Sequence, residues 1–279
     1  TVILPATAFI VLALEAAKEE TGTSSVTLED VTFLRPLELS SPRRLSTMLV
    51  RSGTGGSLRF TSRPIPDGSA TLHCTCTFSF AQSRRVDTFP VPELPPVTGL
   101  YSRFAAAGFH YGPAFQAANL ASDASCAQCD LLRFSGAQFP IHPATLDVAM
   151  HLAALLHPLG VRAVPHTIRR LAFRTGATPV RGRARVVKDE LEFQVLDTIG
   201  EVVCHIEDLR LSMLSAPPTL QVRRPTWRPV PLEPRGIWLA LGEEALGLKL
   251  PRTTNRQEDP HVAVVLAIRA ENLEDVHRC

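Results

Sequence analysis

The spacing of hydrophobic and polar positions changes several times along the first part of the chain. Residues 1–20, TVILPATAFIVLALEAAKEE, are apolar on nearly every side before a charged end, which predicts a fully buried helix. Four later segments have strand composition and are separated by turn signals, and they lie at 26–39, 43–51, 58–64 and 70–80. This order predicts an antiparallel sheet wrapped around one buried helix.

The same order recurs beyond a proline-rich linker at 89–99. A helix is predicted near 143–157, and four strands are predicted after it, near 166–174, 180–188, 190–197 and 200–213. The chain is therefore predicted to hold two similar helix-plus-sheet units of the α+β class, at 1–88 and 100–215.

The remaining residues have a different pattern. A second proline-rich linker covers 216–234, and the tail at 235–279 contains predicted strands at 236–241 and 261–268 with a helix between them. This alternation of strand and helix predicts the beginning of an α/β unit.

Composition and charge narrow the class of protein. Of 279 residues, 45% are hydrophobic and 20% are charged, which is ordinary for a soluble globular protein. The formal net charge of +2 gives no reason to expect nucleic acid or a membrane as a partner. The apolar N-terminal stretch is short for a membrane span and lacks the basic leader of a signal peptide.

The cysteines and arginines are most simply interpreted as structural or surface residues. Cys126 and Cys129 form a lone CxxC without a second pair to complete a zinc site, so no metal is predicted. Cys74 and Cys76 fit small core positions, and scattered cysteines in a long chain indicate a reducing, cytoplasmic setting. Three arginines alternate along one predicted strand, where a solvated face is the simplest interpretation and a docking patch for an acidic partner the alternative: Arg181, Arg183 and Arg185.

The segment HPATLDVAMHLAALL at 142–156 is the most informative stretch for chemistry. Asp147 and His151 share one face of the predicted helix and can interact. One interpretation is that Asp147 only complements the helix dipole and that His151 is incidental. A second signal favours a site, because YGPAF at 111–115 is a turn that can present the Tyr111 phenol beside a pocket.

YGPAFQ at 111–116 and HPATLDVAMH at 142–151 together resemble the YGPxF and DxxxQ/H motifs of the dehydratase domains of modular polyketide synthases. Other segments are also similar to family segments, and they are LPATAF at 4–9, VTLEDVTFLRPLEL at 26–39, VPHTIRRLAF at 164–173 and RRPTWRPVP at 223–231. The motifs occur in the family's order and spacing, and the resemblance spans roughly residues 1–231.

The resemblance implies a double hotdog, in which two antiparallel sheets each wrap around a central helix. It implies an enzyme that removes water from a β-hydroxyacyl thioester carried on the phosphopantetheine arm of an acyl carrier protein, without a metal or redox cofactor. It also implies a homodimer among neighbouring polyketide synthase domains, with the tail as the start of a ketoreductase region.

The resemblance also assigns roles to residues. Asp147 is expected to be the acid that protonates the departing hydroxyl, because apolar neighbours favour its neutral form. His151 is expected to orient Asp147 or the hydroxyl, and the Tyr111 phenol to assist the same group. The residues expected beside the substrate are Pro5, Gly112, Pro113, Phe115 and Leu146.

The base is expected upstream of Thr1. In the family it is the His of HxxxGxxxxP, and Pro5 takes the final position of that motif, so the motif's Gly would directly precede Thr1. None of the nine His present stands at the motif position, so the first hotdog is expected to be truncated at its start. Ala6 replaces the family's usual Gly after that Pro, and His110 beside the YGPAF turn is interpreted as structural.

Three functions are compatible with these residues. The first is a dehydratase domain within a longer multienzyme, and the second is a non-catalytic scaffold of the same shape. The third is a product-template type of double hotdog, which uses a similar His and Asp pair. The intact DxxxH and YGPxF motifs favour the first, and the α/β pattern after the second linker argues against the third.

Overall fold

The computed structural model describes residues 2–23, 25–65, 68–79, 86–134, 139–213, 220–222 and 261–268. The helices are α1 (Ala6–Thr21), α2 (Leu100–Ala106), α3 (Pro143–Met150) and α4 (Ala153–Leu156), with short 3-10 turns η1 (Pro113–Phe115) and η2 (Gly160–Arg162). The first strands are β1 (Val2–Leu4), β2 (Ser25–Phe33), β3 (Leu37–Glu38), β4 (Arg43–Ser52), β5 (Gly55–Pro64) and β6 (Thr71–Ser79). The later strands are β7 (Phe109–Tyr111), β8 (Ala118–Ser122), β9 (Cys126–Asp130), β10 (Ala163–Arg174), β11 (Pro179–Val187), β12 (Glu190–Asp197), β13 (Val202–Met213), β14 (Leu220–Val222) and β15 (His261–Ile268).

Helix α1 is the buried helix that the N-terminal pattern predicts. Pro5 precedes it with an extended backbone, and Gly22 ends it in the left-handed region (φ 67°), where its N–H donates to the Lys18 carbonyl. Residues 9–14 are each at most 3% exposed, so every face of the helix is covered. The prediction of a fully buried helix is confirmed.

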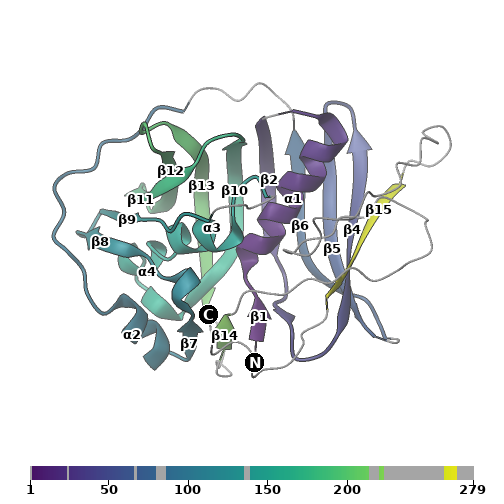
Figure 1. Cartoon of the computed structure of the whole chain (residues 1–279), viewed down its shortest axis with the longest axis horizontal. Helices are drawn as coiled ribbons and strands as arrows, with labels where there is room; N and C mark the ends of the chain where they lie inside the picture. The colour runs from purple at the N-terminus through teal and green to yellow at the C-terminus, as the bar shows by residue number, and fades with distance from the viewer. Residues whose placement is uncertain are drawn as a thin grey trace.

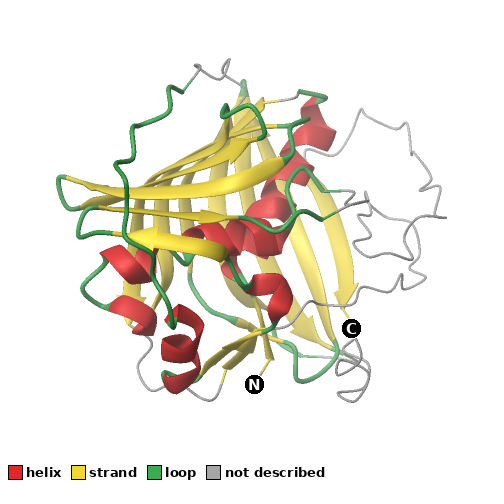
Figure 2. Cartoon of the chain, turned by 60° about the vertical axis from the view of Figure 1, so that its left-hand side comes forward, coloured by secondary structure: helices red, strands yellow, loops and turns green. Residues whose placement is uncertain are grey.

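Antiparallel strands curve around α1 and α3, one helix for each half of the molecule (Figures 1 and 2). Within the described residues, the large sheet has eleven strands in the order β15-β4-β5-β6-β2-β10-β13-β12-β11-β9-β8. The two halves meet where β2 pairs with β10, from Ser25 opposite Arg174 to Thr32 opposite Thr167. The two hotdog sheets are therefore continuous, and α1 and α3 contact each other on the concave side.

A small second sheet lies beside the start of the chain. Its order is β3-β1-β14-β7, and β14 pairs in parallel with both β1 and β7 (Figure 1). The strand β7 ends at Tyr111, and β1 leads through Pro5 into α1. This sheet therefore holds the YGPAF turn on the same side of the molecule as the beginning of α1.

The segment at 100–130 contains regular structure that the hydrophobic pattern did not predict, namely α2 and strands β7, β8 and β9. These elements are short, and sequences such as ASDASCAQCD at 121–130 mix small and polar residues, so neither helical nor strand periodicity stands out. The helix predicted near 143–157 forms in two pieces, α3 and α4, which are separated at His151 and Leu152.

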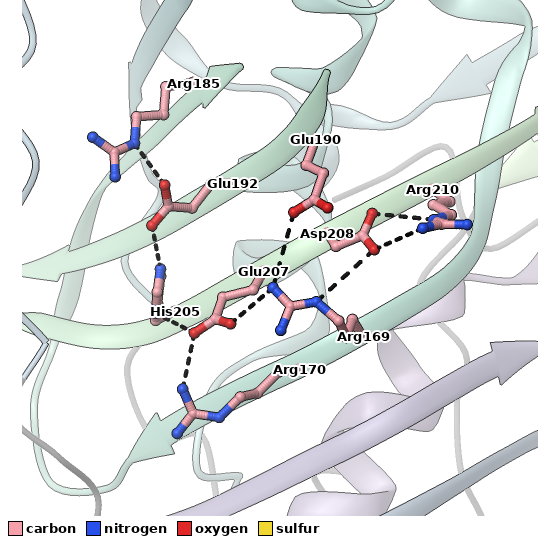
Figure 3. A network of polar contacts seen from close by, with 9 residues as sticks. All are labelled: Arg169, Arg170, Arg185, Glu190, Glu192, His205, Glu207, Asp208 and Arg210. Carbon is pink, nitrogen blue, oxygen red and sulfur yellow. Dashed lines mark hydrogen bonds and ion pairs between the residues drawn. The ribbon is translucent and has the colours of Figure 1, made fainter. Parts of the chain in front are cut away.

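A network of charged side chains covers the outer face of the second half (Figure 3). On β12, Leu191 and Phe193 are buried in the core, so Glu192 between them lies on the opposite face. Glu192 accepts a hydrogen bond from Arg185 at 2.6 Å and pairs with His205 at 2.6 Å. Burial alone would raise the pKa of Glu192, but the Arg185 and His205 interactions together outweigh it and lower that pKa. The other members are Arg169, Arg170, Glu190, Glu207, Asp208 and Arg210.

The proline-rich linker is bound along the same outer face. The Phe89 N–H donates to Gln194 Oε1 at 3.2 Å, and Gln194 Nε2 donates to the Asp87 carbonyl at 2.9 Å. The Arg185 guanidinium lies 4.3 Å from the centre of the Phe89 ring. The start of the linker and the residues just before it are thus fixed to the second half.

These contacts correct the interpretation of the arginine strand as a solvated face. Arg183 and Arg185 are only half exposed, because the linker covers them, and Arg183 donates to the Phe89 carbonyl at 3.4 Å. Arg181 is exposed and pairs with Asp130 at 3.5 Å. Residue spacing located the arginines on one face but carried no information about the segment that crosses it.

Little of the tail belongs to the described residues. The strand predicted at 261–268 forms as β15 and pairs antiparallel with β4 at the edge of the large sheet. The strand predicted at 236–241 and most of the linker at 216–234 lie outside the described residues. None of the described helices combines the length and the apolar character that crossing a bilayer requires.

Candidate active site

Asp147 and His151 lie together where α3 meets α1. They are 8% and 6% exposed, and His151 Nε2 lies 3.2 Å from Asp147 Oδ2. The His151 N–H donates to the Asp147 carbonyl at 3.0 Å, so helical spacing continues through the end of α3. The prediction that the two side chains share a helix face and interact is confirmed.

The residues HP at the start of the motif set the beginning of α3. The Nδ1 atom of His142 accepts a hydrogen bond from the Ala144 N–H at 3.1 Å, and Pro143 occupies the first helical position. The His142 ring stacks on Phe134 with 3.8 Å between ring centres. This cap fixes where the helix starts and therefore which residues of the following turn face α1.

Asp147 is also contacted from the first half of the molecule. Thr7, in the first turn of α1, is completely buried, and its Oγ1 donates to Asp147 Oδ1 at 3.2 Å. The two carboxyl oxygens therefore face Thr7 on one side and His151 on the other. The Thr7 hydrogen bond on one oxygen and the nearby imidazole on the other restrict the orientation of the carboxyl.

Tyr111 packs directly on His151, with 4.2 Å between ring centres. Its carbonyl accepts a hydrogen bond from Gln116 Nε2 at 2.9 Å, which closes the YGPAFQ turn. Burial chiefly, and the Asp147 carboxyl in second place, raise the pKa of Tyr111 well above its usual value, so the phenol keeps its proton. Phe115 is 3% exposed, and its ring lies beside that of Tyr111 with 6.5 Å between ring centres.

The other predicted residues have different surroundings. Pro5 is buried two residues before Thr7. Leu146 is 0% exposed and its side chain packs within the main core. Gly112 has a φ of −67° and an added Cβ there would meet nothing within 4 Å, so the backbone does not require glycine. Pro113 is exposed and begins η1.

Two residues of the site were not predicted. One is Thr7, and the other is Tyr101 on α2, whose Oη lies 3.4 Å from His151 Nδ1 and accepts a hydrogen bond from the Ala117 N–H at 2.6 Å. The sequence contained a signal for each. Thr7 is a polar residue inside an apolar helix, and the chain has only two tyrosines, both of which contact His151.

The arrangement brings a carboxyl group, an imidazole and two phenols together between the two halves. Within the described ranges, no group of three or more His, Cys, Asp or Glu side chains is arranged to hold a metal ion. The CxxC cysteines are three apart on β9, where strand alternation sends them to opposite faces. Burial raises the pKa of Cys129 to about 12, so its thiol is unreactive at neutral pH.

A pocket of about 500 Å³ lies away from these residues, between residues 86–88, which precede the linker, and the neighbouring ends of β10 and β13. Its lining shares no residue with the site around Asp147. It is therefore not part of the candidate active site.

Two family models match this chain. One is described as the polyketide synthase dehydratase N-terminal domain and matches residues 79–221, and the other is described as the polyketide synthase dehydratase domain and matches residues 1–63. The chain belongs to the polyketide synthase dehydratase family. Tyr111, Asp147 and His151 all lie inside the longer match.

Relatives in the dehydratase family are very long proteins. The chain is 30% identical to polyketide synthase GfsE of Streptomyces halstedii over 88% of its length, and 32% identical to pikromycin polyketide synthase component PikAII of Streptomyces venezuelae over 75%. It is 30% identical to the spectinabilin polyketide synthase system protein NorA of Streptomyces orinoci over 77%. It spans only 7%, 6% and 12% of these three proteins, respectively.

Solved dehydratase domains have the same fold. The domain from the CurK module of curacin polyketide synthase superposes with a TM-score of 0.66 at 19% identity, covering 77% of this chain and 85% of that one. A structure from work on dehydratase substrate selection in the borrelidin and fluvirucin polyketide synthases has a TM-score of 0.64 at 25% identity, covering 76% and 81%. The predicted double hotdog is confirmed.

Proposed function

We propose that this chain is the dehydratase domain of a modular polyketide synthase and removes water from a β-hydroxyacyl thioester to give an α,β-enoyl thioester. The observation that carries the proposal is the buried Asp147 carboxyl of a dehydratase-family chain, with one oxygen facing Thr7 and the other facing His151.

Asp147 is the proton donor in this proposal. A base takes the proton from the α-carbon, the electron pair forms the α,β double bond, and the bond from the β-carbon to oxygen breaks. The leaving oxygen takes a proton from Asp147 and departs as water, so atoms and charge balance. Apolar residues on the same helix, such as Val148 and Met150, are buried and limit access of bulk water to the acid.

The base in this proposal is the His of the HxxxGxxxxP motif, and we propose that residues upstream of Thr1 supply it. Two solved CurK dehydratase structures support the pairing of residue types, because each is described as an inactive mutant, one with a His replaced by Phe and the other with an Asp replaced by Asn. We assign the same two residue types in this protein, with Asp147 as the Asp.

The partners follow from the same proposal. The substrate arrives on the phosphopantetheine arm of an acyl carrier protein, and the relatives support neighbouring synthase domains, since they are polyketide synthase components. Elimination of water from a β-hydroxyacyl thioester changes no oxidation state overall, so acid and base groups suffice and no further cofactor is invoked. We also propose that the protein forms a homodimer and that it is located in the cytoplasm.

Replacing Asp147 with Asn tests the acid in the chain joined to its native upstream residues. The amide keeps the shape but cannot give the proton, so turnover is expected to fall by about 10²- to 10⁴-fold while the fold remains. Tyr111→Phe is the comparison, because it removes one supporting hydroxyl, and its loss is expected to be smaller. Enoyl product is measured by mass spectrometry with a pantetheine-linked β-hydroxyacyl substrate. Wild-type turnover by Asp147→Asn would overturn the assignment.

The same assay tests the base. The 279-residue chain alone is expected to form no enoyl product, and the chain with its upstream residues is expected to form it. Equal rates from both would place the base within residues 1–279. Inactivity of both, with circular dichroism showing a folded protein, would indicate a non-catalytic scaffold.

A further inference from the structure

Tyr101 contacts the site from outside both sequence motifs. It lies on α2, and its ring is inclined at 70° to that of His151 with 5.8 Å between ring centres. Its Oη has two polar neighbours among the described residues, the Ala117 N–H at 2.6 Å and His151 Nδ1 at 3.4 Å. The hydroxyl therefore links the main chain after the YGPAF turn to the imidazole beside Asp147.

The direction of these hydrogen bonds follows from what each group can do. The Ala117 N–H can only donate, so it occupies a lone pair on Oη and leaves the phenol proton for another acceptor. Burial raises the pKa of Tyr101 above its usual value, so the phenol keeps that proton at neutral pH. If the proton did not reach His151 Nδ1, a half-buried hydroxyl would be left without an acceptor for its proton.

An imidazole that accepts at Nδ1 carries its single proton at Nε2 when it is neutral. That Nε2 is buried, makes no hydrogen bond of good geometry to any described residue, and lies 3.2 Å from Asp147 Oδ2. In the opposite tautomer Nε2 would be an acceptor and could take the proton of Asp147 for itself. A neutral acid beside such an acceptor would share its proton with His151 instead of giving it to a substrate.

We infer that Tyr101 is a positioning residue that fixes His151 in the tautomer protonated at Nε2, so that the buried N–H donates toward the Asp147 carboxyl and the departing oxygen. The inference rests on the proposed function for the identity of that oxygen. The tautomer itself is a property of the free protein and does not depend on turnover.

The first test is the protonation state of the two His151 nitrogens in the 279-residue chain. Nitrogen-15 NMR of protein labelled in histidine distinguishes a protonated from an unprotonated ring nitrogen, and His151→Gln identifies the signals. The proton is expected on Nε2 in the wild type, and Tyr101→Phe is expected to move both nitrogen shifts toward a mixture of tautomers. A wild-type proton on Nδ1 overturns the inference whether or not the variant folds.

The second test compares Tyr101→Phe in two backgrounds, using the chain with its upstream residues. With His151 present, the variant is expected to lower kcat about tenfold with little change in KM. In the His151→Gln background the amide N–H₂ has no tautomer to fix, so Tyr101→Phe should change kcat little. An equal loss in both backgrounds would indicate a merely structural role and overturn the inference.

The two tests also separate this inference from the proposed function. If no version of the chain forms enoyl product but the tautomer behaves as expected, the proposed function fails and the assignment of Tyr101 to His151 stands. If turnover is normal and Tyr101→Phe leaves both the tautomer and kcat unchanged, the dehydratase assignment stands and the role of Tyr101 fails.

Discussion

Thr7 reaches the acid from the opposite half of the molecule and donates to Asp147 Oδ1 at 3.2 Å. Thr7→Val keeps nearly the same shape and removes only the hydroxyl, so one carboxyl oxygen loses its donor at a cost of about 1–3 kcal/mol. Turnover is expected to fall about tenfold as the acid loses its fixed orientation. The measurement is kcat for enoyl formation by the chain with its upstream residues.

Thr7→Ser is the matched control, because it retains the hydroxyl and loses only a methyl group. It should keep most of the turnover that Thr7→Val loses. Equal rates for Thr7→Val and wild type would mean that His151 alone is enough to orient Asp147.

At the scale of residues, the sequence predicted the helical pair but not its neighbours. Asp147 and His151 were found because helical spacing within one segment reports directly on a shared face. Thr7 lies 140 positions from Asp147 and Tyr101 lies 50 from His151, and no local periodicity carries information about such contacts. Leu146 stays a predicted substrate neighbour, and its side chain is buried in the main core.

Helix α3 packs against strand β11 at Gly182. A Cβ added to Gly182 of β11 would lie 3.2 Å from Ala149 Cβ and 3.2 Å from Cys129 Sγ, closer than ordinary packing allows. Gly182→Ala is therefore expected to push α3 outward and lower the free energy of unfolding by about 1–3 kcal/mol. Since α3 carries Asp147 and ends directly before His151, turnover should fall as well. Urea unfolding followed by circular dichroism measures the stability.

Gly112→Ala is the stability control for that substitution. A Cβ at Gly112 meets nothing within 4 Å and its backbone is ordinary, so stability should change by less than about 0.5 kcal/mol. If Gly182→Ala is as stable as wild type, the contact between α3 and β11 is looser than these distances state.

Elements with a long, regular pattern were predicted from the sequence, and short or mixed ones were not. Helix α1 was predicted because apolar residues fill a segment of helix length, and strand β13 was predicted because its segment is long and rich in strand-forming residues. Helix α2 and strand β7 are short and pack on each other, and β7 pairs with β14, which lies more than a hundred positions later in the chain. The position of the linker on the outer face could not be predicted for the same reason. Phe89 is held there by Gln194 and Arg185, which are about a hundred positions away in the sequence.

The continuity of the large sheet predicts how the whole molecule unfolds. Burial raises the pKa of Cys76 in the first half and of Cys129 and Cys204 in the second half to about 12, so all three thiols should be unreactive in the folded protein at pH 8. Because β2 and β10 join the halves, the three thiols should become reactive at the same urea concentration.

Pulsed alkylation followed by peptide mass spectrometry measures each thiol separately. Cys126 is half-exposed and serves as the internal reference, since it should react before unfolding. Two distinct urea midpoints, one for Cys76 and another for the later thiols, would show that the halves unfold independently.

The pairing of β2 with β10 also bears on how synthases can be recombined. The proline-rich linker at residues 89–99 suggests a junction at which the two halves of different dehydratases could be exchanged. Yet a chimera joined at that point would set a foreign β2 against β10, and would separate the Thr7 of one parent from the Asp147 of the other. The unit of exchange is therefore the complete double hotdog, from the residues before Pro5 to beyond β13.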